Sequence, residues 1–161
     1  MEDDLRNELV DLYFRLIHDK QHSLFHPPTF IASVRENKAA MVLVFAILSL
    51  AARFVSYLTT PFPDLKLIRF SSNPYFHDTE PWSRGHAWAK QSKLLFDSRL
   101  VPISVEALQA CTLLLHIAFT EGDMENESLY AALAIRMVQR MELPTVLSHD
   151  RVEREVQIRR K

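Results

Sequence analysis

Two helical patterns joined at a single glycine constrain the fold of this chain more than any other feature. From Ser104 to Pro144, apolar residues recur at spacings of three and four on both sides of Gly122. Ser104 is a favoured N-cap residue, and glycine readily adopts the left-handed conformation that ends many helices. A link as short as residues 122–124 makes consecutive helices run antiparallel. This segment therefore predicts a helical hairpin.

The two helices of this hairpin differ in how much of their surface is apolar. Residues 104–121 carry one apolar stripe, and further apolar residues cover most of the remaining surface, which indicates a helix that is buried on several sides. Residues 125–141 are apolar mainly on one side. That side contains Leu129, Tyr130, Leu133, Met137, Val138 and Met141.

The same periodicity predicts about seven helices in all and no strand. The other five are expected at residues 3–19, 30–37, 39–58, 81–100 and 150–161. A second short link, at residues 101–103, also favours antiparallel neighbours. The predicted fold class is therefore all-α, with stacked antiparallel helical hairpins in a single domain that spans residues 1–161.

Prolines mark several of the expected boundaries. Pro27 and Pro28 should stop any continuation of the first helix, and Thr29 stands where an N-cap hydroxyl of the next helix would lie. Pro81 suits the first turn of the fourth helix. Residues 59–79 contain several prolines and no sustained periodicity, so they are expected to form a long surface loop.

Composition excludes several classes of function. The formal net charge is -1, which gives no global attraction to nucleic acid or to anionic lipid. One cysteine, Cys111, rules out an internal disulfide and fits a reducing compartment. The acidic amino terminus does not resemble a signal peptide. The most apolar run, residues 39–52, is shorter than the about 20 residues of a membrane span and indicates a buried helix.

Few residues suggest chemistry. His18, His22 and His26 lie four residues apart and could ligate a metal on one continuous helix, but Pro27 disfavours helical dihedrals at His26. Ordinary polar or buried histidines are the favoured interpretation. Cys111 falls within an apolar stripe, away from the side of the helix that carries His116, so it is expected to be a small buried hydrophobe and not a nucleophile.

Other potential sites are also weak. The chain has two glycines, Gly85 and Gly122, which are too few and too far apart for a phosphate-binding loop or a nucleophile elbow. The basic residues of 151–161 alternate with acidic ones and indicate a solvated or partner-facing helix. Aromatic residues could floor a ligand pocket, although such residues at helical spacing are more often core. These are Trp82, Trp88 and Phe96. No catalytic, cofactor-binding or metal-binding residue is predicted.

Five phrases in order resemble a known family. They are ELVDLYFRLIHDKQHSLFHPPTF, AMVLVFAILSLAARFV, ISVEALQACTLLLHIAF, ESLYAALAIRMVQRMEL and EREVQIRRK. Each phrase alone is weak, but together they cover nearly the whole chain. The chain resembles the fungal-specific transcription factor domain, which is the middle homology region of fungal zinc-cluster transcription factors.

This resemblance implies a non-catalytic regulatory domain in a nuclear transcription factor. Such a domain lies C-terminal to a zinc cluster and modulates the activator through protein partners, the remainder of the transcription factor or a small-molecule effector. The zinc cluster that contacts DNA in this family needs several cysteines, and this chain has one. Specific DNA binding and zinc would therefore require a domain that is absent from this chain.

The sequence departs from the family pattern in two further places. Residues 141–145 read Met-Glu-Leu-Pro-Thr, where the family usually ends a helix with glycine. The family domain also continues beyond the position of Lys161, which is compatible with a fragment, a truncated product or a reduced family member. If the family core continues, the last hairpins should expose an apolar patch.

Two other functions stay open from the sequence. A helical-hairpin scaffold that binds another protein is one, although no clear tetratricopeptide-like period is present. An all-α enzyme is the other, and it would need convergent titratable groups that these positions do not supply.

Overall fold

The computed structural model describes residues 3–20, 22–55, 76, 79–97 and 102–141. Its elements are α1 (Asp3–Leu16), α2 (Pro27–Arg35), α3 (Met41–Ala52), the 3₁₀-helix η3 (Pro81–Ser83), α4 (His86–Asp97), α5 (Val105–Glu121) and α6 (Met124–Arg140). Within those ranges, an isolated β-bridge between His18 and His22 is the only extended pairing. The predicted all-α class is confirmed.

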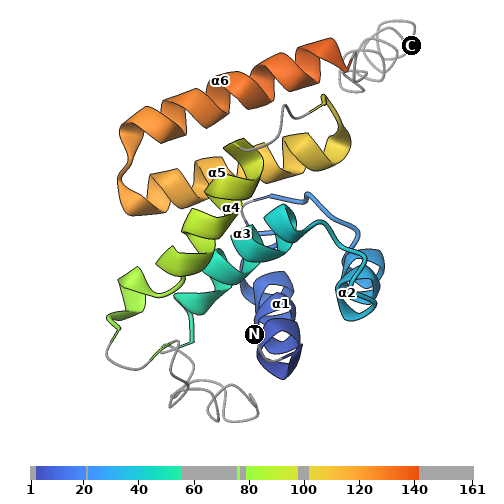
Figure 1. Cartoon of the computed structure of the whole chain (residues 1–161), viewed down its shortest axis with the longest axis vertical. Coiled ribbons are helices and arrows are strands. Elements are labelled where there is room, and N and C mark those ends of the chain that lie inside the picture. The colour runs from blue at the N-terminus through green and yellow to red at the C-terminus, as the bar shows by residue number, and fades with distance from the viewer. Residues whose placement is uncertain (1–2, 21, 56–75, 77–78, 98–101, 142–161) are drawn as a thin grey trace, which may run out of the picture.

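Helix α3 is the centre of the core. It packs against α1, α4 and α5, and Figure 1 shows it between α1 and the layer formed by α4 and α5. Ten of its side chains are buried: Val42, Leu43, Val44, Ala46, Ile47, Leu48, Ser49, Leu50, Ala51 and Ala52. The run is too short to cross a membrane, and no helix in the described part of the chain is long and apolar enough to do so.

The hairpin of α5 and α6 forms as the sequence predicts. The Ser104 hydroxyl accepts a hydrogen bond from the Ala107 amide at 3.1 Å, and Gly122 ends α5 in the left-handed conformation with φ 71°. The Asp123 carboxylate caps α6 by accepting from the Asn126 amide at 3.1 Å. The two helices run antiparallel, with α6 as the outermost layer (Figure 1).

The start of the second helix differs from the prediction. Pro27 and Pro28 do not precede α2 but form its first turn, where the missing amide hydrogen costs no helical hydrogen bond. His26 takes the N-cap position in place of Thr29. The His26 Nδ1 atom lies 2.8 Å from the Thr29 hydroxyl, so this threonine stabilises the preceding turn from inside the helix.

Three other predicted boundaries are also wrong. The first helix ends at Leu16, because the following residues turn and Asp19 adopts a left-handed φ of 60°. The third ends at Ala52 and not near residue 58. The fourth does not begin at Pro81, because Arg84 is extended and Gly85 has φ 89°, and this break separates η3 from α4.

The predicted loop at residues 59–79 lies outside the described residues except for Phe76 and Thr79, and the predicted helix at 150–161 lies wholly outside them. Phe76 is buried, and its ring meets that of Trp88 edge-on with centroids 6.2 Å apart.

Candidate functional site

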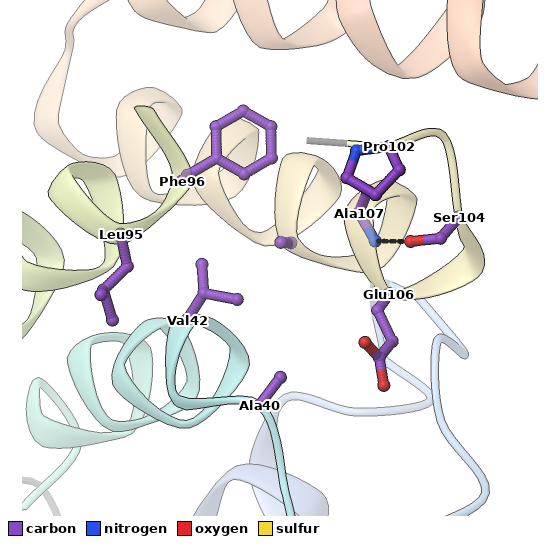
Figure 2. A pocket seen from close by; sticks show the side chains of 9 residues that line it. Ala40, Val42, Leu95, Phe96, Pro102, Ser104, Glu106 and Ala107 are labelled. Atoms are coloured by element: carbon purple, nitrogen blue, oxygen red, sulfur yellow. Dashed lines mark hydrogen bonds between the residues drawn. The ribbon is translucent and has the colours of Figure 1, made fainter. Parts of the chain in front are cut away.

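A small hollow lies where the start of α5 meets α3 and α4. It has a volume of about 100 Å³, and Figure 2 shows side chains of α3, α4 and α5 converging on it. Its lining is formed by Ala40, Val42, Leu95, Phe96, Pro102, Ser104, Glu106, Ala107 and Ala110. The cap at Ser104 fixes the first turn of α5 and with it the position of Glu106 on the rim.

A second hollow of about 370 Å³ adjoins the first between α2, α3 and α5. It is lined by Phe25, His26, Thr29, Phe30, Ser33, Lys38, Ala39, Ala40, Leu43, Glu106 and Gln109. Because Ala40 and Glu106 line both hollows, we treat them together as the α3–α5 groove. The Gln109 side-chain amide donates to the Leu24 carbonyl at 2.6 Å and so holds the α1–α2 link beside the groove.

The lining of the groove is mostly apolar, with a few polar and charged side chains. Its floor is aromatic and aliphatic, and its rim carries the charges of Glu106 and Lys38. Its titratable side chains are Glu106, Lys38 and His26. Such a lining suits an apolar or amphipathic ligand, or an apolar side chain of another segment.

The three histidines considered as metal ligands have separate partners. The His18 Nε2 accepts from the Phe25 amide at 3.3 Å, the His22 Nε2 lies 2.6 Å from the Tyr13 hydroxyl, and His26 pairs with Thr29. Among the described residues, no group of three or more His, Cys, Asp or Glu side chains could hold a metal ion.

The surroundings of His22 change the pKa of its imidazole ring. Its ring packs against that of His116 with centroids 4.9 Å apart. Burial, and then the charges of His116 and His18, lower the pKa of His22 to about 4. Burial and the charge of Asp19 raise the pKa of Tyr13, so its hydroxyl stays protonated beside His22.

The pKa of His22 makes acid sensitivity an expected property of the fold. Between its ordinary pKa of 6.5 and about 4, the unfolded chain binds a proton that the folded chain does not. The free energy of unfolding should therefore fall as the pH falls through that window, by about 1–2 kcal/mol after allowance for partial exposure of the ring. Urea unfolding from pH 7.5 to 4.5 measures it, and His22→Gln should reduce the slope. An unchanged slope in the variant would contradict this assignment.

Cys111 is buried, as predicted. Its thiol donates to the Tyr130 carbonyl at 3.1 Å across the α5–α6 interface, and burial raises the pKa of this thiol to about 11. A thiol that stays protonated is a poor nucleophile. His116 faces the α1–α2 link, where it meets His22, and so does not pair with Cys111.

Sequence reasoning missed a charged junction at the end of α5. The Glu121 carboxylate lies 2.9 Å from Lys93 Nζ, 3.6 Å from the Arg53 guanidinium and 3.7 Å from His86 Nε2. These contacts tie the end of α3 and two successive turns of α4 to the end of α5. The available signal was a glutamate in the last turn of a helix, where the helix dipole favours cations. Such a glutamate needs positive neighbours.

The three aromatic residues considered as a pocket floor lie in different surroundings. Trp88 packs in the core against Phe76, and Trp82 is 68% exposed. Phe96 is buried and lines the α3–α5 groove. The centroid of its ring lies 5.9 Å from that of the Tyr130 ring. Only Phe96 therefore contributes to the groove described here.

Comparison with known families shows to which family this chain belongs. The family description "Fungal specific transcription factor domain" matches residues 10–161. The chain belongs to this family. The fungal transcription factor domain is also similar to an uncharacterized transcriptional regulatory protein of Schizosaccharomyces pombe, with 27% identity over 141 residues. The match covers 87% of the chain and 13% of that relative, so the chain spans a small part of its length. No solved structure matches the fungal transcription factor domain of this chain.

Proposed function

We propose that this domain regulates a fungal transcription factor without catalysing a reaction, by responding to an occupant of the α3–α5 groove. Family membership supports a role in the regulation of transcription. The observation that carries the finer proposal is the lining of the groove, which joins α2, α3, α4 and α5 around an apolar floor with Glu106 on its rim. An occupant would therefore change how α3, α4 and α5 pack together.

The occupant that fits this lining is a small amphipathic effector or an apolar side chain from the remainder of the transcription factor. By the same proposal, the domain works in the nucleus and contacts DNA only through a separate zinc-cluster domain. The net charge of -1 supports that division of labour, because proteins that bind phosphate backbones carry a clear positive excess. In a gel-shift assay, this chain alone should show no sequence-specific DNA binding.

A reporter assay with the groove filled tests the proposal. The chain is inserted between a heterologous DNA-binding domain and an activation domain, and reporter transcription is measured for wild type and Thr29→Trp. Thr29 is exposed and lines the groove, so an added indole should occupy it without disturbing the core. We expect wild type to alter reporter output and Thr29→Trp to change that effect several-fold.

The matched control is Gln91→Trp, which adds the same indole to an exposed position of α4 that does not line the groove. It should behave as wild type. Equal outputs for all three proteins, with circular dichroism showing each folded, would contradict regulation through the groove. If the chain instead binds a protein partner in a pull-down but leaves reporter transcription unchanged, the alternative function of a helical-hairpin scaffold is favoured.

A further inference from the structure

The segment that joins α1 to α2 folds into a compact turn. The Asp19 amide donates to the His22 carbonyl at 2.9 Å, and the Phe25 amide donates to the His18 Nε2 atom at 3.3 Å. These hydrogen bonds close the turn on itself. We call the described residues between His18 and Phe25 the link turn.

The link turn is attached to α5 by side-chain contacts. The His22 ring meets the His116 ring edge-on, with centroids 4.9 Å apart and an angle of 80° between the planes. Beside this contact, the Leu24 carbonyl accepts the hydrogen bond from the side chain of Gln109, which lines the α3–α5 groove. Two imidazoles thus lie where the turn meets the helix.

His22 is surrounded by titratable groups from three parts of the chain. Tyr13 faces it from α1, His18 and Asp19 face it from the link turn, and His116 faces it from α5. Asp19 is the one group here that favours the charged ring, and it is a smaller influence than burial and the two other histidines. Burial also lowers the pKa of His116. These surroundings favour neutral rings at the contact.

Protonation would remove what holds His22 in place. A neutral imidazole can accept a hydrogen bond from the Tyr13 hydroxyl, whose oxygen lies 2.6 Å from the His22 Nε2 atom. An imidazolium has no acceptor nitrogen, so this bond could no longer be donated by the hydroxyl. If both rings were charged, two cations would also lie in contact at a half-buried site, where like charges are costly.

We propose that the contact between His22 and His116 is an acid-sensitive latch, and that protonation of these rings releases the link turn from α5 while the helices stay folded. The flanks of the turn limit the movement. Ile17 is buried, and the Phe25 ring packs against the Phe30 ring with centroids 4.5 Å apart. Release would free Gln109 beside the groove, and only this consequence rests on the function proposed above.

The direction of the pH effect follows from the shift of His22. Its pKa is about 4 in the closed turn and 6.5 when the ring is free, so the latch holds fully above pH 6.5 and weakens as the pH falls towards 4. Between pH 7 and pH 5 the ratio of open to closed turn should therefore rise about tenfold, after allowance for partial exposure of the ring.

Hydrogen exchange of the Asp19 and Phe25 amides, followed by NMR on the full chain, measures this opening. Their protection factors should fall about tenfold from pH 7 to pH 5. They should also lie well below those of α3 at each pH, because a local opening is easier than global unfolding. Dilute urea should speed exchange in α3 but not in the turn, since a local opening exposes little surface.

Three variants separate the latch from other causes. His22→Gln should remove most of the pH dependence of protection in the turn. His116→Gln should weaken that dependence and raise the pKa of His22, measured by NMR titration of its ring. His86→Gln is the matched control, because His86 is an exposed histidine of α4, and it should behave as wild type. Circular dichroism shows that each protein is folded.

Several results would overturn the latch. They are equal protection in the turn and in α3, protection of the turn that does not change between pH 7 and pH 5, and the same pH dependence in His22→Gln as in His86→Gln. Exchange measures the release itself, so a reporter unaffected by Thr29→Trp would contradict the function of the groove and not the latch.

Discussion

Gly85→Ala is expected to destabilise the domain by about 4 kcal/mol, which is among the largest effects of any single methyl group in this chain. Gly85 has φ 89°, a conformation that side chains with a Cβ rarely adopt. A Cβ there would lie 2.5 Å from the Ser49 carbonyl oxygen and 2.8 Å from the Ser49 Cα. These are backbone atoms in the middle of α3, so they cannot rotate away. Urea unfolding followed by circular dichroism measures the loss.

Gly122→Ala provides the matched control. Gly122 also has positive φ, at 71°, but a Cβ there would meet no atom within 4 Å. This variant should lose only about 1 kcal/mol, the cost of the left-handed conformation. The difference between the two variants isolates the close approach of α3 and the start of α4. Equal losses would show that these two elements do not pack as described.

Leu48→Ala is expected to cost about 3–4 kcal/mol of unfolding free energy. Leu48 is fully buried on α3, the helix that contacts α1, α4 and α5. Removing its side chain loses the transfer free energy and leaves a cavity, because neighbours on several sides cannot all collapse inward. Chemical denaturation of the purified chain checks this value.

The control for that variant is Leu94→Ala. Leu94 lies on α4 and is 52% exposed, so the same truncation should change the unfolding free energy by less than about 1 kcal/mol. A small effect at Leu48, similar to that at Leu94, would contradict the central place of α3 in the core.

The parts of the fold that depend on neighbouring residues could be predicted from the sequence. The two ends of α5 are set by Ser104 and Gly122, whose side chain or backbone acts within a few residues. The break between η3 and α4 could not be predicted, because it depends on the contact of Gly85 with Ser49 on another helix. Apolar periodicity continues across that break and hides it.

The candidate site was less predictable than the fold. The α3–α5 groove combines residues of α2, α3, α4 and α5, and no local pattern marks them as neighbours. The contact of His22 with His116 and that of Glu121 with Arg53 likewise join distant segments. The spacing of His18, His22 and His26 drew attention to one helical face, yet their chain segment is a turn in which each imidazole has its own partner.

The most direct test of a folded regulatory domain is reporter transcription from the two glycine variants. The chain is placed between a heterologous DNA-binding domain and an activation domain, and an unrelated spacer of equal length gives the baseline. Gly122→Ala should regulate the reporter as wild type does, and Gly85→Ala should regulate it less, in proportion to the fraction of the protein that its lower stability leaves unfolded. Wild-type output equal to that of the spacer, or full regulation by an unfolded Gly85→Ala protein, would contradict the account.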